Sequence, residues 1–237
     1  MARTHYEKIT TSDGDFDAFC ALPENSPAPA VLVFQEVFGI NDNIRGLTEQ
    51  LADAGYLALA PDVFWRTEPR FERKDESGLA DGMAHVQQLD FDLVPADLTA
   101  TMAHTLAMPE CNGRVGGVGF CLGGTLAYLF AATARVDGRG PDAAVSYYGS
   151  GVHNMLGLAP SIECPVLFHY GAQDPYIPAE QIDQVESALA GRPDVVLHRY
   201  EAGHAFSNWD APTFYDERAA NTAWPRTLSF LEKHLRR

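Results

Sequence analysis

The chain has 237 residues, of which 46% are hydrophobic and 21% are charged. That length is enough to bury a large core, and we expect one domain over residues 1–237. No segment approaches the ~20 apolar residues of a membrane span. The formal net charge of −15 argues against nucleic acid or an anionic membrane as partner, because both need clustered Lys and Arg. An anionic substrate would likewise have to be held by local cations.

The N-terminal residues 1–8 contain no apolar signal region, so we expect a cytoplasmic protein. The four cysteines, Cys20, Cys111, Cys121 and Cys164, form no C-x-x-C pair and no dense disulfide pattern, so reduced thiols are expected. The eight histidines lack H-x-x-x-H and H-E-x-x-H spacing, and no G-x-G-x-x-G opens a helix after the first buried strand. We therefore expect no metal and no cofactor.

The predicted elements alternate between strands and helices along most of the chain. Apolar runs predict strands over residues 6–10, 16–22, 30–35, 56–60, 114–118, 143–148, 166–170 and 195–200. Helical spacing predicts helices over residues 41–54, 97–106, 125–130, 179–190 and 214–235. The first two strands flank a turn-forming cluster and should pair as an antiparallel hairpin at a sheet edge. The later strand–helix–strand order favours parallel crossovers, which predicts an α/β fold with a mainly parallel sheet and helices on both faces.

Residues 64–82 interrupt this pattern with a charged segment that has no strong periodicity. Two interpretations remain open. The segment is either a solvated loop or a lid over the strand ends, because long loops in compact domains often cover a functional site.

The residues Gly119-Phe120-Cys121-Leu122-Gly123-Gly124 lie between a predicted strand and a predicted helix. In a G-x-nucleophile-x-G elbow, the central residue is strained at the tip of the turn, and small neighbours let strand and helix approach. Cys121 holds the nucleophile position, where the positive end of the helix favours thiolate. The alternative is that Cys121 is a buried small hydrophobe, as free cysteines usually are.

Two further residues follow predicted strands in a fixed order. Asp174 lies in a turn after residues 165–170, and His204 follows residues 195–200. Singly, Asp174 could be a solvated turn residue and His204 an ordinary loop histidine. Nucleophile, acid, histidine is, however, the chain order of the α/β-hydrolase fold, and it predicts a Cys-His-Asp triad.

Five motifs stand at Gln35–Asn41, Gly119–Gly124, Tyr147–Gly149, Gly171–Asp174 and Gly203–Phe206. Together they resemble the dienelactone hydrolases (carboxymethylenebutenolidases), and the resemblance covers nearly the whole chain. A cysteine at the elbow, where most hydrolases of this fold place serine, is itself typical of that family. The resemblance implies the α/β-hydrolase fold and a cofactor-free enzyme that cleaves a carboxylic ester or lactone.

Glu36 comes directly after a predicted buried strand, where a carboxylate is costly unless it is paired or belongs to a site. The resemblance implies that Glu36 is the family's active-site glutamate, which contacts the thiol and helps to generate thiolate. It also implies an oxyanion hole formed by the backbone N–H groups of Val37 and Leu122. Two roles for Glu36 remain open: a base that takes the thiol proton, or a residue that only holds its loop in shape.

The chain departs from the family at the substrate. The family's dienelactone-binding arginine, four residues after the histidine, is replaced by Asn208, and its other arginine falls near Asp81. Arg66, Arg70 or Arg73 could supply a cation instead. The predicted substrate contacts are Phe38, Trp65, Arg70, Tyr147 and Trp209, which would line an apolar, aromatic cleft.

The expected partner is therefore a small-molecule ester or lactone, bound by a monomer or a weak homo-oligomer. Two alternatives remain: an esterase for unrelated neutral esters, and a catalytically silent binding module, because fold does not fix function.

Overall fold

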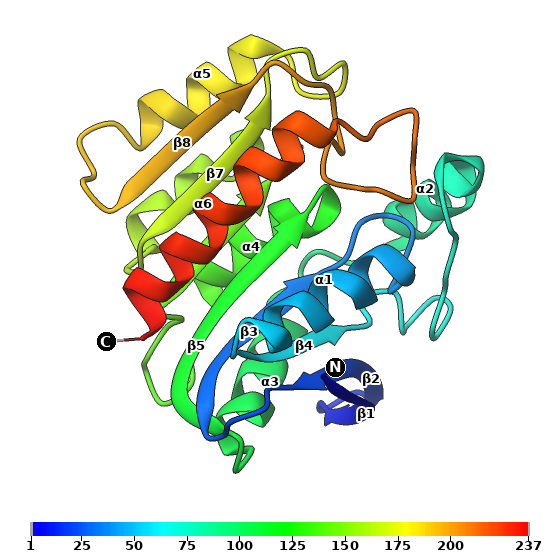
Figure 1. Cartoon of the computed structure of the whole chain (residues 1–237), viewed down its shortest axis with the longest axis vertical. Coiled ribbons are helices and arrows are strands. Elements are labelled where there is room, and N and C mark those ends of the chain that lie inside the picture. The colour runs from blue at the N-terminus through cyan, green and yellow to red at the C-terminus, as the bar shows by residue number, and fades with distance from the viewer. Residues whose placement is uncertain (1, 237) are drawn as a thin grey trace.

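The computed structural model describes residues 2–236, and its centre is an eight-stranded sheet (Figure 1). The strands are β1 (Arg3–Thr10), β2 (Asp15–Leu22), β3 (Ala28–Phe34), β4 (Leu57–Pro61), β5 (Cys111–Phe120), β6 (Ala143–Tyr147), β7 (Val166–Gly171) and β8 (Val195–Tyr200). Their order in the sheet is β1-β2-β4-β3-β5-β6-β7-β8. The β1/β2 and β2/β4 pairs are antiparallel, and every neighbouring pair from β4 to β8 is parallel.

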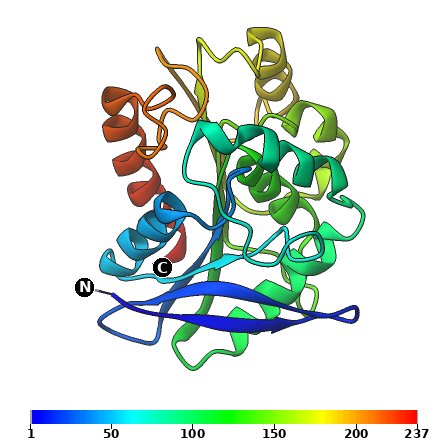
Figure 2. The ribbon, with the colours of Figure 1, turned by 90° about the vertical axis from the view of Figure 1, so that its right-hand side faces the viewer.

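The helices are α1 (Asp42–Asp53), α2 (Leu79–Gln88), α3 (Val94–Ala107), α4 (Leu122–Thr133), α5 (Ala179–Ala188) and α6 (Glu217–Leu235), with 3₁₀ turns η1 (Glu76–Gly78) and η2 (Val152–Ser161). Helices α1 and α6 cover one face of the sheet, and α3 and α4 cover the other (Figure 2). The α/β prediction, with a mainly parallel sheet and helices on both faces, is confirmed. Within residues 2–236, no helix has the length and apolar character needed to cross a membrane.

Local sequence explains where several elements begin and end. The Asn41 side chain caps α1 by accepting a hydrogen bond from the Ile44 N–H at 3.1 Å. Gly55 follows the end of α1 with φ +88°, a conformation that glycine adopts readily. At α6, the Asp216 side chain accepts from the Ala219 N–H at 2.8 Å, so this helix begins at Glu217 rather than at the predicted residue 214.

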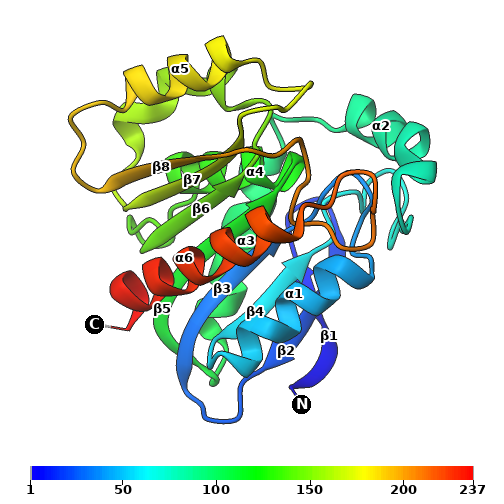
Figure 3. The same cartoon turned by 45° about the horizontal axis from the view of Figure 1, so that its top comes forward.

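Helix α2 was not predicted, because it buries almost none of its surface in the core. Only Gly82 is buried among its residues, and its apolar residues Leu79, Met83 and Val86 remain partly exposed. Two glycines, Gly78 and Gly82, further lower the helical signal. The helix lies beside the tips of the central strands and away from the two main helical layers (Figure 3).

The turn between β5 and α4 brings backbone atoms into very close approach. Cys121 occupies it with φ +55° and ψ −116°, a strained conformation for a residue with a side chain. A Cβ added to Gly119 would lie 1.8 Å from the Gly123 carbonyl oxygen, and a Cβ added to Gly123 would lie 2.0 Å from the Phe34 carbonyl oxygen. Both obstacles are backbone atoms and cannot rotate away, so only glycine fits at either position.

Replacing Gly123 by valine should prevent correct folding, because the side chain would push α4 away from β3 and β5. Gly157→Val is the control, since nothing lies within 4 Å of a Cβ at that position. Thermal unfolding and yield of folded protein would be compared for the two variants and the parent. Folded Gly123→Val with the parent's melting temperature would contradict this account of the elbow.

Candidate active site

The predicted site residues come from four different loops that meet at one edge of the sheet. Glu36 follows β3, Cys121 follows β5, Asp174 follows β7 and His204 follows β8. These strands are mutually parallel, so their carboxyl ends lie at the same edge, where open α/β sheets bind ligands. Strand geometry alone therefore brings residues that are 168 positions apart in the chain, from 36 to 204, into one place.

Cys121, His204 and Asp174 form a continuous chain of contacts. The Cys121 Sγ lies 3.1 Å from His204 Nε2, and His204 Nδ1 lies 2.7 Å from Asp174 Oδ2. Backbone N–H groups of Tyr176 and Ile177 donate to Asp174 Oδ1 at 2.8 and 3.2 Å. The Asp174 side chain has no exposed surface, so it is a fixed acceptor for the imidazole and not a solvated turn residue.

The electrostatics of His204 favour its charged form. Burial lowers the pKa of the imidazole, but the Cys121 sulfur and the Asp174 carboxylate outweigh burial and raise the pKa well above its usual value. An imidazolium 3.1 Å from the sulfur is the counter-ion that a thiolate needs. The first turn of α4, which begins at Leu122, adds the positive end of a helix dipole at the same atom.

Glu36 is a buried carboxyl with one partner. Its side-chain Oε2 accepts a hydrogen bond from Asn208 Nδ2 at 2.5 Å, and both residues are almost fully buried. Burial raises the pKa of Glu36 to about 7, against opposing contributions from the His204 charge and from Asn208 and Tyr148. The pKa of Glu36 thus lies near neutrality, and the side-chain hydrogen bond of Glu36 is to Asn208 and not to Cys121.

A pocket of about 170 Å³ opens above these groups. Its polar side chains are Glu36, Cys121, Ser150, Tyr176 and His204, and the rest of its wall is apolar. No lysine or arginine of the described chain, residues 2–236, lines it. The remaining lining residues are Val37, Phe38, Leu79, Met83, Val86, Leu122, Ala205 and Phe214.

Comparison with known proteins bears on this geometry. Residues 16–235 match the sequence model described as "Dienelactone hydrolase family". The chain belongs to the dienelactone hydrolase family. It is 36% identical over 222 residues to the carboxymethylenebutenolidase of Pseudomonas sp. (strain P51), covering 93% of this chain and 91% of that relative. It is 34% identical over 227 residues to carboxymethylenebutenolidase 1 of Cupriavidus pinatubonensis, covering 95% and 94%.

A solved structure extends the comparison to three dimensions. The dienelactone hydrolase-like promiscuous phosphotriesterase P91, from metagenomic libraries, superposes with a TM-score of 0.81 at 25% identity, covering 98% of each chain. The likeness supports the predicted α/β-hydrolase fold, and the relatives' names identify the chain as a hydrolase of this family.

Helix α2 forms one wall of the pocket and rests on the loop after β3. Leu79, Met83 and Val86 face the cavity at the spacing of one helix side. A Cβ added to Gly82 would lie 2.2 Å from the Val37 carbonyl oxygen, so glycine allows the helix to touch that loop. Sequence reasoning missed these residues, although the 79, 83, 86 spacing was a usable signal. Leu79 also falls within residues 64–82, so this segment contributes to the pocket wall.

The aromatic residues predicted as substrate contacts differ in whether they border the pocket. Phe38 lines the pocket, but Trp65, Tyr147 and Trp209 do not. Trp65 stacks on Phe16 with ring centroids 5.4 Å apart and donates to Asp97 at 3.0 Å. Tyr147 is buried, with its hydroxyl 2.6 Å from Thr227 Oγ1 of α6. Trp209 is 38% exposed and packs against Gly46 of α1.

The arginines proposed as substitute cations are also engaged elsewhere. None of the three, including the predicted substrate contact Arg70, lines the pocket. Asp81, near which the family's other arginine falls, does not line the pocket either and is paired with Arg73. The pairs are Arg66 with Asp13 and Asp97, Arg70 with Asp17, and Arg73 with Asp81.

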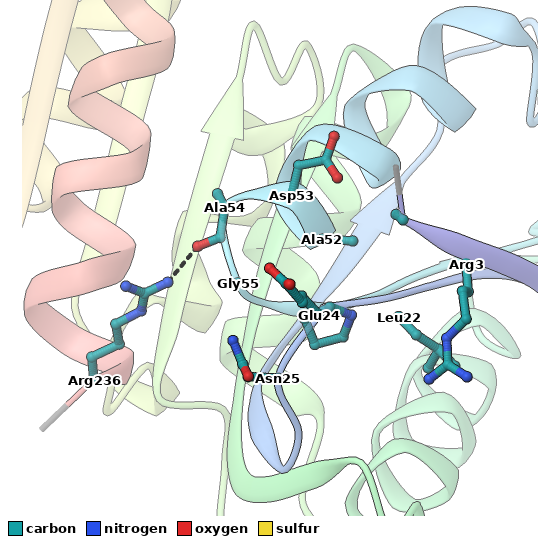
Figure 4. A pocket seen from close by; sticks show the side chains of 11 residues that line it. Arg3, Leu22, Glu24, Asn25, Ala52, Asp53, Ala54, Gly55 and Arg236 are labelled. Carbon is teal, nitrogen blue, oxygen red and sulfur yellow. Dashed lines mark hydrogen bonds between the residues drawn. The ribbon is translucent and has the colours of Figure 1, made fainter.

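A larger hollow of about 740 Å³ lies at the other end of the parallel strands (Figure 4). It is bordered by the loop before β3, by the end of α1 and by Arg236, whose guanidinium donates to the Ala54 carbonyl. None of the predicted site residues reaches it. Over residues 2–236, no three His, Cys, Asp or Glu side chains gather closely enough to hold a metal ion.

Proposed function

We propose that this protein hydrolyses a small, uncharged carboxylic ester or lactone with Cys121 as the nucleophile. The observation that carries the proposal is the contact chain from Cys121 through His204 to Asp174 at the base of an apolar pocket. A silent binding module would have no need of a buried histidine held between a thiol and a carboxylate, since buried charges are costly.

In this mechanism, the Cys121 thiol loses its proton when substrate arrives, and the resulting thiolate, stabilised by His204, attacks the substrate carbonyl carbon. Asp174 keeps the Nδ1–H of the imidazole in place, so that Nε2 faces the sulfur and later donates its proton to the leaving alkoxide. The N–H groups of Val37 and Leu122 receive the developing oxyanion. Both residues border the pocket, and Leu122 opens α4, where the N–H lacks an intrahelical acceptor. Water then hydrolyses the acyl enzyme.

Glu36 acts in this scheme as the base that takes the thiol proton when substrate arrives. A general base works best when its pKa lies close to the working pH, and burial raises the pKa of Glu36 to about 7. Glu36 also borders the same pocket as Cys121. The purely structural role remains the competing explanation, and it predicts a different outcome for Glu36→Gln.

The pocket determines the substrate class. A carboxylate on the substrate would meet the Glu36 carboxyl and neither a lysine nor an arginine, and the charged His204 imidazole is already paired with Asp174 and Cys121. A second candidate reaction, hydrolysis of a neutral phosphotriester, shares this requirement for an uncharged substrate. It is suggested by the activity in the name of the metagenomic relative P91.

Cys121→Ala should abolish hydrolysis of a small aryl ester and leave the fold intact, because the side chain supplies the covalent step and little packing. A thiol reagent should label Cys121 before the two buried cysteines Cys20 and Cys164, whose pKa values burial raises to about 12. Steady-state rates, mass spectrometry and thermal unfolding give the three readouts. A variant within threefold of the parent rate would exclude Cys121 as nucleophile.

Glu36→Gln should lower kcat/KM by roughly 10²–10⁴, typical of general-base catalysis, because glutamine keeps the shape but accepts no proton. It should also raise stability above pH 7. The free energy of unfolding of the parent falls as pH rises from 4.5 to about 7, because Glu36 ionises in the unfolded chain at about 4.5 but keeps its proton in the folded protein up to about 7. At about 1.4 kcal/mol per pKa unit, the expected gain near pH 8 is about 3 kcal/mol, vanishing near pH 4.5.

Denaturant unfolding and kcat/KM from pH 5 to 9 would test both statements on the same preparations. Because the variant is expected to be more stable, a rate loss could not be blamed on unfolding. A stability gain with an unchanged rate would assign Glu36 the structural role.

Neutral esters and lactones should be better substrates than dienelactone, which carries a free carboxylate. A missing charge-assisted hydrogen bond predicts about a 10- to 150-fold lower kcat/KM for the anion. Pairs of substrates that differ only in methylation of that carboxylate provide the matched comparison, and a neutral phosphotriester completes the panel. If dienelactone were the best substrate, an arginine would have to leave its ion pair to reach the pocket.

A further inference from the structure

Two buried polar atoms beside the pocket lack hydrogen-bond partners among residues 2–236. They are Glu36 Oε1 and the Tyr148 hydroxyl. Buried polar groups are nearly always paired, so each such atom calls for an explanation. A carboxylate oxygen only accepts and a phenol can donate, so each group supplies what the other lacks.

The backbone of Tyr148 is strained, and its surroundings hold it in that conformation. It follows β6 with φ +39°, which is rare for an aromatic residue and persists only where the surroundings impose it. Its N–H donates to the His169 carbonyl at 2.7 Å, and its ring lies 5.2 Å from both the His204 and Phe206 rings. The side chain is fully buried and does not line the pocket, so it contacts His204 from the protein interior and not from the cavity.

The charges around Tyr148 keep its hydroxyl protonated. Burial raises the pKa of Tyr148 well above its usual value, and the neighbouring Glu36 and Cys121 groups raise it further. The hydroxyl is therefore a permanent donor. In return, Tyr148 lowers the pKa of the Glu36 carboxyl, although the two groups do not reach hydrogen-bond geometry in this conformation.

We propose that Tyr148 is a positioning residue for Glu36, and that its hydroxyl donates to Glu36 Oε1 when that carboxyl ionises. With Asn208 already on Oε2, the ionised carboxylate then has one donor on each oxygen. The inference rests on the proposed function, because it assigns Tyr148 to the working form of the base.

The groups that face Glu36 are few. The loop after β8 contributes His204 and Asn208, the loop after β6 contributes Tyr148, and the elbow contributes Cys121, which borders the same pocket. Of these, only Asn208 and Tyr148 are neutral hydrogen-bond donors. Removing the Tyr148 hydroxyl should therefore disfavour ionised Glu36 specifically.

Tyr148→Phe removes the hydroxyl and keeps the ring against His204. The Glu36 carboxyl carbon, assigned by its disappearance in Glu36→Gln, would be titrated by ¹³C NMR in the full-length protein. The variant should raise the pKa of Glu36 by about one to two, as expected for a lost hydrogen bond to a charged group. Tyr128→Phe is the control, because that buried hydroxyl donates to the Met155 carbonyl, away from the pocket, and should leave the titration unchanged.

The same variants would be compared in kcat/KM from pH 5 to 9. Tyr148→Phe should lose about 10- to 100-fold on the acidic side and recover towards the parent rate at pH 9, because only the fraction of ionised Glu36 changes. A role in packing alone would lower the rate equally at every pH. Should Tyr148→Phe not fold, 3-fluorotyrosine at 148, a stronger donor of similar shape, should move the Glu36 titration to lower pH.

An unchanged Glu36 titration in the folded variant, or in the fluorotyrosine protein, would overturn the proposal. Its failure is distinguishable from failure of the proposed function. The NMR titration requires no turnover, whereas an inactive parent on every ester and lactone would refute the hydrolase mechanism and leave the Tyr148–Glu36 pairing intact.

Discussion

The site depends on one close backbone approach, in which Gly119 of β5 lies against Gly123 of α4 and Gly123 lies against Phe34 at the end of β3. Because the Gly123 position lies against the Phe34 carbonyl, α4 starts immediately at the sheet edge and Cys121 is forced to positive φ. That conformation points the thiol out of the turn, to within 3.1 Å of His204. The same close approach fixes the first residue after β3, so the elbow and the Glu36 loop share one backbone contact.

Much of this arrangement could be predicted from the sequence, because each part is local. The elbow is read from small residues at fixed spacing, and Asp174 and His204 are read from their places directly after apolar strands. Parallel pairing then gathers strand ends without further information. The buried strands were predicted for the same reason, because a short continuous apolar run is typical of a strand that is covered on both faces of a parallel sheet.

The substrate contacts could not be predicted in this way, because they depend on which side chains pair with one another. Trp65 was expected in the pocket, yet it is held by Phe16 and Asp97 from segments far away in the chain. Arg73 is likewise taken up by Asp81, an acid on α2. Helix α2 itself escaped detection, since its apolar side lines a cavity and only Gly82 of the helix is buried. Pairing partners and cavity walls are properties of the folded chain.

The replacement of the family's arginine by Asn208 connects the two unusual properties of this pocket. A guanidinium at this position would place a full positive charge beside Glu36 and lower the pKa of its carboxyl, as an opposite charge does within a few ångströms. The neutral amide gives one hydrogen bond instead, so burial dominates and raises the pKa of Glu36 to about 7. The same exchange removes a cation that could have bound an anionic substrate. A Glu36 carboxyl with a pKa near neutrality and a pocket lined by neither Lys nor Arg are thus both linked to the neutral side chain at 208.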